Sequence, residues 1–483
     1  MKINFIRWNN LIAYGCLSIV VIVLTFFVVY KANWLFGDQA EWLRTTAISK
    51  IEQLSHHIIP AEGRFCPLCH FSYNILTFIP FGYTATAHYI LNAVSFIIFV
   101  IAFIFLLNKI VIVGHNSSLN IWIIVCTMLF LIQRIYPVFL DVIFPERIVV
   151  TLLAVFIFFT WQFYKTNKWN YGILALLCAV YMVYCKEPLF GALLVFAITN
   201  LVLNWKNLSS NNRIFQWILV VNSLIFVILY YFFVYRGIVS PYTGNHGENN
   251  WVNMSLRMIW GQKIVIIAII LFFFRIYAIF FKKIRDSLFY DGLLFAGLAY
   301  FGACLVLKLN YTYYYLPAVI LFTPAIVYWL IHYLKPFGAF GVMAFFALFY
   351  LVKLPTMIRD NQQKRKDTYP TIEHIANYVP AGYQLVWYEA KSSGRHFWNN
   401  ELRDWKKSSL QAYLAYILKD EKFKFVTVNS LLESKNHKTL ILYPLENDFI
   451  NNESTNQFTI ETQQLSKDTI AQIADITIMK LSK

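Results

Sequence analysis

The side chains best suited to acid–base chemistry lie in polar loops between long apolar runs. Residues 1–354 contain only ten acidic residues, and four of them fall in the segment Asp38–His70, after the first apolar run. These four are Asp38, Glu41, Glu52 and Glu62. A carboxylate at such a position can accept a proton from a hydroxyl or amine, so Asp38 and Glu41 are candidate general bases. Their three-residue spacing is also that of a helix capping box, and this structural alternative stays open.

A second acidic loop has the sequence FLDVIFPERIVV and contains Asp141, Glu146 and Arg147. Two carboxylates and an arginine in so short a loop could bind a divalent metal such as Mg²⁺ or Mn²⁺, a phosphate, or both. Asp141 and Glu146 are the candidate metal ligands. The alternative is ordinary helix-end chemistry, because Pro145 can open a helix and Glu146 favours its N-terminus.

Cations in the same set of loops are candidate ligands for a phosphate group. They are Arg64, Arg147, Lys186, Arg257 and Lys308. Arginine can hold a phosphate through two hydrogen bonds, whereas lysine supplies a point charge. Taken alone, Arg64, Arg257 and Lys308 are also compatible with simple interfacial anchors. Lys186 and Glu187 are also compatible with a plain interfacial turn or a Lys–Glu pair. The tyrosines after Lys308, Tyr311 and Tyr313–Tyr315, predict an interfacial aromatic belt, with stacking on a sugar as the alternative.

Two of the seven cysteines, Cys66 and Cys69, form a CPLC pair in the first loop. In an oxidising compartment such a pair could form a disulfide. A metal site would need two more ligands, and only His70 is close in the sequence. We therefore expect an unreactive pair or a disulfide. The other five cysteines lie in apolar runs and are expected to be small core residues.

Composition places these loops on a membrane protein. The 483 residues are 59% hydrophobic and only 14% charged, which is little charge for a soluble chain of this length. Apolar runs long enough to cross a bilayer recur along residues 1–354, which predicts an α-helical polytopic membrane protein with about eleven transmembrane helices. The predicted spans are Leu11–Tyr30, Ala85–Leu107, Ile121–Leu140, Ile148–Tyr164, Tyr171–Cys185, Pro188–Asn204, Ile214–Tyr235, Gly261–Phe281, Leu288–Leu307, Thr312–Tyr333 and Phe337–Lys353.

The density of basic residues in the predicted loops favours a cytoplasmic N-terminus. Eleven spans then place the C-terminal tail outside the cytoplasm, in a multi-pass protein of the plasma (inner) membrane. With this orientation, all acids of residues 1–354 except Asp286 and Asp291 face outward. The same residues carry 24 Lys and Arg against ten acids. That positive balance fits anionic lipid head groups or a phosphorylated lipid substrate, and nothing in the chain indicates nucleic-acid binding.

The predicted transmembrane domain, residues 1–354, contains a long first outer loop at 31–84. Apolar residues from Trp42 to Ile58 recur every three to four positions, which predicts a helix lying in the plane of the membrane surface. From residue 355, polar runs replace apolar ones, which predicts a small soluble α/β domain over 355–483. Its predicted helices are Ile372–Tyr378 and Asp404–Ile417, and its predicted strands are Gln384–Tyr388, Phe425–Val428, Thr439–Tyr443 and Phe458–Thr462.

This arrangement resembles the GT-C glycosyltransferases, a superfamily of multi-spanning membrane enzymes. The resemblance covers the whole chain: one span, a long outer loop with an early acid in FGDQAEWL, its continuation to GRFCPLCHFSYN, a second acidic loop in DVIFPER and a soluble tail. It implies that a sugar moves from a polyprenyl-phosphate carrier to a glycan, lipid or protein acceptor at the outer face of the membrane.

The resemblance also implies roles for single residues. Asp38 would be the catalytic base, and Asp141 or Glu146 would take a second acidic position that sometimes binds a metal. The cations would bind the lipid phosphate. The first loop has no doubled acid, so the choice between Asp38 and Glu41 stays open.

Two other functions also stay open. An O-antigen polymerase or ligase would centre on a late outer loop with Arg and His, and the loop from Arg236 to Trp260 contains Arg236, His246 and Arg257. A flippase or transporter for lipid-linked glycans would need polar residues along a path across the spans. Charges within the spans are scarce, since Arg134 and Arg275 both fall near predicted helix ends.

Overall fold

A computed structural model gives the fold of the chain. It describes residues 2–35, 38–44, 57–60, 63–112, 119–238, 251–284, 288–309, 311–388, 397–420, 423–428, 439–444, 466–473 and 476–482. The chain divides into two compact units. The first unit consists of Met1–Tyr30, Ser55–Tyr73 and His88–Ile358, and the second consists of Lys31–Leu54, Asn74–Ala87 and Arg359–Lys483.

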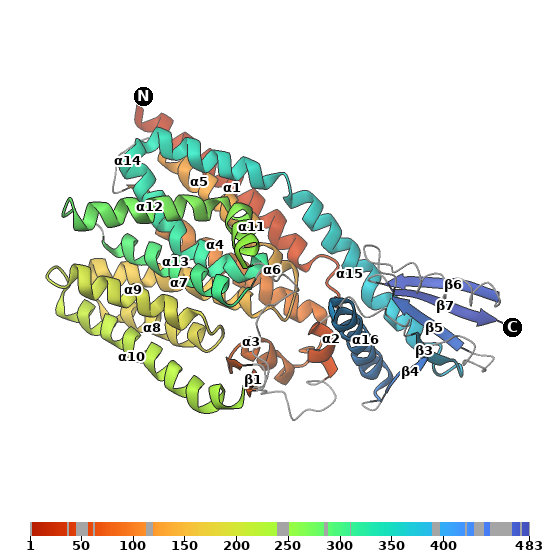
Figure 1. Ribbon diagram of the computed structural model, residues 1–483. Helices are drawn as coiled ribbons and strands as arrows, with labels where there is room; N and C mark the ends of the chain where they lie inside the picture. Colours follow the sequence, from red (N-terminus) through yellow and green to blue (C-terminus); the bar gives the residue numbers. More distant parts are fainter. Residues whose placement is uncertain are drawn as a thin grey trace. The chain divides into compact units, whose positions relative to one another are not determined.

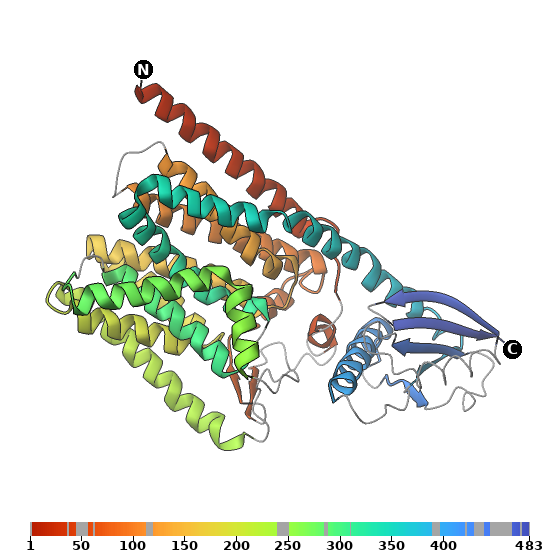
Figure 2. The ribbon, with the colours of Figure 1, turned by 45° about the horizontal axis from the view of Figure 1, so that its top comes forward.

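The first unit is a bundle of apolar helices, coloured from red to green in Figures 1 and 2. Its helices are α1 (Lys2–Val29), α3 (Phe71–Asn74), α4 (Ala85–Ile112), α5 (Leu119–Ile135), α6 (Pro137–Leu140), α7 (Pro145–Thr166), α8 (Trp169–Val183), α9 (Leu189–Asn204), α10 (Ser210–Phe233), α11 (Trp251–Gly261), α12 (Lys263–Phe280), α13 (Leu288–Val306) and α14 (Leu316–Leu351). The 3-10 turns η4 (Tyr235–Gly237) and η5 (Thr312–Tyr315) and the short hairpin β1 (His57–Ile59) and β2 (Arg64–Cys66) join them. α15 (Leu354–Ala376) leads into the second unit.

The predicted multi-pass architecture is confirmed. In the part of the chain that the structure describes, seven helical stretches are long and apolar enough to cross a membrane, and α5, α8 and α9 are shorter apolar helices. Each of the eleven predicted spans coincides with one of these stretches. The last two spans lie in α14, which is broken at Lys335 (φ 57°, ψ 172°) just before Pro336. Proline cannot donate a helical hydrogen bond, so the chain changes direction between them.

Close packing holds the bundle together. α14 packs against α5 and α13, and α13 packs against α9. A Cβ atom on Gly292 of α13 would lie 2.7 Å from Nδ2 of Asn200 on α9, so a larger residue there would require the Asn200 side chain to shift. Association of helices in a bilayer depends on such contacts, because lipid and side chains are equally apolar. Many apolar side chains of α10 and α12, such as Phe232 and Phe273, are exposed and thus available to lipid.

The connections between helices fall at two ends of the bundle. Ser209 donates a hydrogen bond of 2.8 Å to Oδ1 of Asn167, so the α7–α8 and α9–α10 connections share one end. Lys186, in the α8–α9 connection, contacts Glu146 in the first turn of α7, so these two share the opposite end. This separation follows the alternation expected of successive spans.

The second unit is an α/β domain with two pieces of the predicted first outer loop added to it. Its strands are β3 (Gln384–Tyr388), β4 (Val426–Val428), β5 (Thr439–Pro444), β6 (Ser466–Ile473) and β7 (Ile476–Ser482), in the order β4-β3-β5-β7-β6. β3 is parallel to β4 and β5, whereas β7 is antiparallel to β5 and β6. Its other helices are α2 (Asp38–Leu43) and α16 (Phe397–Leu418), and the 3-10 turn η3 spans Ile75–Phe78.

The local predictions for the soluble tail and the first loop had mixed outcomes. Three of the predicted strands coincide with β3, β4 and β5, and the predicted helix Asp404–Ile417 lies within α16. The predicted helix Ile372–Tyr378 covers the end of α15 but runs two residues past its last residue, Ala376. Strands β6 and β7 were missed, and the predicted strand Phe458–Thr462 lies outside the described residues. The predicted helix Trp42–Ile58 is wrong at its end, because Ile58 pairs with Phe65 in the β1–β2 hairpin. Residues 45–56 of that helix also lie outside the described residues.

Candidate active site at one end of the helical unit

A buried ion pair joins two of the predicted site residues. Nζ of Lys186 lies 2.6 Å from Oε1 of Glu146, and both side chains are almost fully buried. Pro145 and Glu146 open α7, so the carboxylate sits at a positive helix N-terminus. Lys186 sits in the tight turn between α8 and α9, where Lys186 N–H donates to the carbonyl of Met182 at 3.0 Å. The two short connections therefore fix both partners.

The ammonium of Lys186 has a second neighbour. It lies 4.3 Å from the ring centroid of Tyr314, in the turn η5 that precedes α14. Burial acts to lower the pKa of Lys186, but Glu146, Tyr314 and Glu187 oppose it, and the pKa is raised above the ordinary 10.5. Lys186 is therefore cationic at neutral pH. Among the described residues, its one hydrogen-bond partner is Glu146.

The β1–β2 hairpin adds further charges to this end. The N–H group of Phe65 donates to Oε1 of Glu187 at 3.1 Å, which attaches β2 to the α8–α9 turn. Arg64, next to Phe65 and half-buried, acts electrostatically on Lys186. Gly63 precedes it with φ 74°, a conformation that favours glycine, and its carbonyl accepts from the hydroxyl of Tyr230 at 3.0 Å. Thus Arg64 is held near the Glu146–Lys186 pair by contacts on both sides.

Arg147 is fully buried beside this pair and anchors the first loop. Its guanidinium donates to Oγ of Ser95 on α4 at 2.6 Å and to Oγ of Ser72 on α3. The guanidinium carbon also lies 4.5 Å from the ring centroid of Tyr73. These contacts give Arg147 a positioning role. Phosphate binding by Arg147 stays a prediction.

Tyr73 extends the anchor towards α4. Its hydroxyl donates to Oδ1 of Asn92 at 2.9 Å, and its ring stacks on that of His88 at 5.5 Å. The amide of Asn92 in turn donates to the carbonyls of Phe139 and Asp141, at 3.1 and 2.7 Å. Tyr73 and Asn92 were not among the predicted site residues. The only signal was their polar character next to apolar runs, which gives no indication of partners 19 to 49 residues away.

The two predicted metal ligands are each engaged with a different group. Oδ1 of Asp141 accepts from the N–H of Val142 at 2.8 Å, and Glu146 pairs with Lys186. Within the described part of the chain, no group of three or more His, Cys, Asp or Glu is arranged to hold a metal ion. Since a lysine already neutralises Glu146, this donor set does not fit Mg²⁺ or Mn²⁺ well. Metal dependence stays a prediction.

The remaining predicted site residues are spread more widely. Asp38 and Glu41 are the first and fourth residues of α2 in the second unit, and the structure describes only their backbone. Arg257 is exposed on α11. Lys308 is half-buried and follows the end of α13. Its backbone has a left-handed conformation (φ 54°), which helps to terminate the helix. His246 of the O-antigen-type loop lies outside the described residues.

Three thiols lie next to the hairpin. Cys66 and Cys69 are buried thiols, and the N–H of Cys69 donates to the carbonyl of Cys66 at 3.1 Å in a turn. Sγ of Cys185 contacts the carbonyl of Leu68 at 3.2 Å. A hydrogen bond with Cys69, burial and the nearby Glu187 all raise the pKa of Cys66. A protonated, buried thiol is a poor nucleophile, as expected for an unreactive pair.

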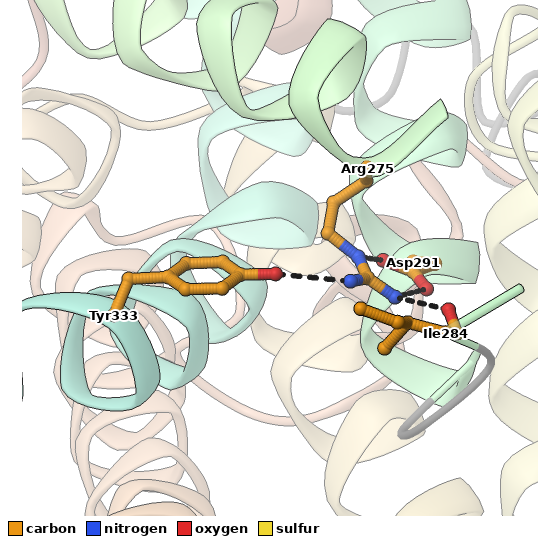
Figure 3. Close-up of polar contacts among 4 residues, drawn as sticks. All are labelled: Arg275, Ile284, Asp291 and Tyr333. Atoms are coloured by element: carbon orange, nitrogen blue, oxygen red, sulfur yellow. Dashed lines mark hydrogen bonds and ion pairs between the residues drawn. The ribbon is translucent and has the colours of Figure 1, made fainter. Parts of the chain in front are cut away.

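A second buried ion pair lies far from this site. Arg275 of α12 donates to both carboxylate oxygens of Asp291 on α13, at 2.8 and 2.9 Å, and to the hydroxyl of Tyr333 at 3.0 Å (Figure 3). Tyr290, adjacent to Asp291, accepts from the indole of Trp161 at 3.2 Å, near the end of α7 opposite Glu146. Fifteen helical residues separate Glu146 from Trp161, or about 22 Å at 1.5 Å per residue. The two ion pairs thus occupy opposite ends of α7.

Solved structures with a similar fold include ArnT from Cupriavidus metallidurans. In complex with undecaprenyl phosphate, ArnT aligns with 97% of this chain and 97% of its own, with a TM-score of 0.52 at 9% sequence identity. The apo form of ArnT aligns over the same shares, with a TM-score of 0.51 at 10% identity. ArnT is a GT-C protein.

This chain has a GT-C-like fold. The resemblance inferred from the order of spans and loops is thereby confirmed at the level of the fold. Neither a protein-family model nor a curated protein sequence matches the chain. Because only about one residue in ten is identical, the GT-C likeness concerns the architecture alone. The roles of single residues follow from their own geometry.

Proposed function

We propose that this protein is a membrane glycosyltransferase that moves a sugar from a polyprenyl-phosphate carrier to a glycan, lipid or protein acceptor. The observation that carries the proposal is the Glu146–Lys186 pair, which lies with Arg64 and Glu187 at one end of a GT-C-like bundle. A buried, permanently charged lysine with one carboxylate partner is suited to receive a phosphate. ArnT, with a similar fold, has been solved with undecaprenyl phosphate bound.

The reaction assigns a task to each group. A carboxylate, Asp38 in this proposal, takes the proton of the acceptor hydroxyl or amine as that atom bonds to the sugar. The bond between the sugar and the phosphate oxygen breaks, and the polyprenyl phosphate leaves with its electron pair. Lys186 and Arg64 stabilise the negative charge that develops on this leaving group. Glu41 is the alternative base. Whether the reaction also uses a divalent metal is tested with EDTA.

The proposal includes an orientation. The end that carries Glu146, Lys186 and the β1–β2 hairpin faces away from the cytoplasm, with a cytoplasmic N-terminus and an extracytoplasmic C-terminal domain. Loop charges support this orientation. The transferred sugar is a hexose or a pentose.

Binding of the carrier is the first test. The purified full-length protein in detergent is titrated with undecaprenyl phosphate, and complexes are counted by native mass spectrometry. We expect saturable binding of undecaprenyl phosphate and much weaker binding of undecaprenol, which has the same chain without the phosphate. Equal binding of both lipids would contradict a site built for the phosphate.

Transfer is the second test. Protein reconstituted with lipid extract from its native membrane is followed by mass spectrometry for the release of undecaprenyl phosphate from lipid-linked sugars. We expect release by the wild type and by Glu41→Gln, and a loss of at least about 100-fold in Asp38→Asn, the range typical of a lost general base. The reverse pattern would make Glu41 the base. Carrier binding without any release in the wild type would reject the transferase and favour a lipid-linked glycan transporter.

A further inference from the structure

The second unit brings α16 of the soluble tail against α2, the helix that begins at Asp38. These segments are more than 350 residues apart in the chain. We propose that the C-terminal domain positions Asp38, with Tyr413 as the positioning residue. This inference rests on the proposed function for the role of Asp38, and on the contacts inside the second unit for the rest.

The packing between the two helices is dry. Ala40 and Leu43 of α2 are fully buried, as are Leu410, Tyr413 and Leu414 of α16. α2 has only six residues. An isolated helix of this length is unstable in water, because nucleation costs more than so few hydrogen bonds return. The conformation at Asp38 therefore depends on what α2 packs against.

A chain of hydrogen bonds fixes the residues on both sides of Asp38. The hydroxyl of Tyr413 donates to the carbonyl of Leu35, three residues before Asp38. The N–H of Leu35 donates to Oε1 of Gln39 at 2.8 Å, one residue after Asp38. Tyr413 thus holds a loop whose two ends enclose Asp38. All three side chains are buried, so water competes little for these bonds.

A second set of contacts closes the same loop from the other side. The rings of Trp34 and Trp42 lie 6.0 Å apart, and the indole of Trp42 donates to Oδ1 of Asn74 at 2.9 Å. Asn74 begins the other loop segment of this unit, Asn74–Ala87. From that segment, Tyr83 acts electrostatically on Tyr416, one turn beyond Tyr413 on α16. The hydrogen bond from Trp42 to Asn74 thereby joins the two loop segments of the unit.

The test compares Tyr413→Phe with Tyr378→Phe in the full-length protein. Tyr413→Phe removes the hydroxyl that reaches Leu35 and keeps a ring that can pack edge-on against Tyr369. Tyr378 belongs to the same unit and contacts His374 and Tyr383, so it is a matched control. Hydrogen exchange of the peptide covering residues 35–43 is measured by mass spectrometry. We expect exchange to rise about tenfold, equivalent to about 1.4 kcal/mol, in Tyr413→Phe and to stay unchanged in Tyr378→Phe.

The kinetic readout separates positioning from a purely structural role. In the transfer assay, we expect Tyr413→Phe to lower kcat about tenfold and to leave KM for the lipid-linked donor within twofold, because the carrier-binding residues belong to the other unit. If Tyr413→Phe fails to fold, hydrogen exchange and kcat are measured on Gln39→Met instead, because this change removes the acceptor of the Leu35 N–H. Unchanged exchange in the folded variants would overturn the inference. Faster exchange with unchanged kcat would overturn the positioning role.

Failure of the proposed function would look different. If the wild type releases no undecaprenyl phosphate, hydrogen exchange still tests whether Tyr413 holds the loop around Asp38. In that case, the inactive wild type rejects the proposed transferase function. The exchange result still shows whether Tyr413 holds the loop.

Discussion

The two buried ion pairs at the ends of α7 differ in how completely their charges are satisfied. The guanidinium of Arg275 has both oxygens of Asp291, the hydroxyl of Tyr333 and the carbonyl of Ile284 as acceptors, and it lies 3.7 Å from the ring centroid of Trp329. Among the residues whose placement the structure describes, the ammonium of Lys186 contacts one oxygen of Glu146 and one face of Tyr314. An ammonium has three N–H donors, so Lys186 can bind a further acceptor, whereas the guanidinium of Arg275 lacks this capacity.

The difference separates a structural pair from a binding pair. A ligand that competed for Arg275 would have to replace several bonds made by three elements, and the pair instead joins α12, α13 and α14. A phosphate that approached Lys186 would replace a single carboxylate oxygen with oxygens of higher charge. Burial and ion pairing alone would rank the two sites equally. The number of contacts per charge is what distinguishes them.

The largest effect on carrier binding is expected for Lys186→Met. Loss of the buried cation removes a charge-assisted bond to the phosphate, worth about 2–5 kcal/mol, and should weaken binding of undecaprenyl phosphate by at least about 30-fold. Binding is measured by native mass spectrometry on protein that elutes as a single species from gel filtration. Lys186→Arg is the control, because it keeps the charge and should retain part of the affinity. Unchanged binding in Lys186→Met would place the phosphate elsewhere and remove the functional side of the comparison.

Arg275→Met should affect stability and leave the chemistry intact. Removing one partner of a buried pair leaves Asp291 as an uncompensated charge, which costs about 3–5 kcal/mol. The apparent melting temperature in detergent should fall, while transfer per folded molecule stays within twofold of the wild type. The double variant with Asp291→Leu should recover much of the loss, since no charge is then left unpaired. A selective loss of carrier binding in Arg275→Met would contradict the structural assignment.

The sequence singled out both residues of the Lys186–Glu146 pair as site candidates, but it predicted neither of the two pairings. Lys186 and Glu146 were singled out because charged residues in short turns between apolar runs are conspicuous, although their contact across 40 residues was not predicted. Arg275 was read as a cation near a helix end, and its partner Asp291 as an exception to the outward placement of acids. Pairing across α12 and α13 depends on helix rotation, which apolar spans of uniform hydropathy do not encode.

In the fold too, some features were predictable from the sequence and others were not. Spans were predictable because the bilayer demands about 20 apolar residues per helix, a requirement visible in one sequence. The attachment of α2 to α16 was not predictable. It joins residues such as Leu35 and Tyr413, which are more than 350 positions apart, and no local sequence pattern links them. The strand at His57–Ile59 was predicted as helix because the apolar spacing up to Ile58 suits a helix, whereas pairing with β2 determined its conformation.

Glu146→Gln tests whether the carboxylate competes with the phosphate for Lys186. The amide keeps an acceptor for the ammonium but removes the charge that a phosphate must replace. We expect undecaprenyl phosphate to bind up to about tenfold more tightly, a gain of up to 1.4 kcal/mol. Asp291→Asn is the matched control at the other end of α7 and should leave carrier affinity unchanged. Weaker binding in Glu146→Gln would mean that the carboxylate supports the bound state instead of competing with it.

The raised pKa of Lys186 predicts a flat pH dependence. Because Glu146 holds the pKa above 10.5, the ammonium remains protonated below that value, and its contribution is lost only as the pH rises through the still higher pKa of the folded state. Binding of undecaprenyl phosphate should therefore change less than twofold between pH 7.5 and 9.5. The phosphate is already doubly charged over this range, so it adds no titration of its own. A decline centred below pH 9.5 would show that Lys186 is not the cation responsible.

The smallest effect is expected for the double variant Cys66→Ala/Cys69→Ala. Both thiols lie at the functional end of the bundle, Cys66 in the strand that carries Arg64 and Cys69 in the turn that follows it. Hydrogen bonding and burial raise the pKa of Cys66, so its thiol holds no charge at neutral pH. If charge is what distinguishes this end, carrier binding should stay within twofold. Mass spectrometry after iodoacetamide at pH 7 should find both native thiols largely unmodified, and both modified after denaturation. Modification that requires prior reduction would reveal a disulfide, and a large loss of binding in the variant would show that the hairpin, more than the Lys186 charge, shapes the phosphate site.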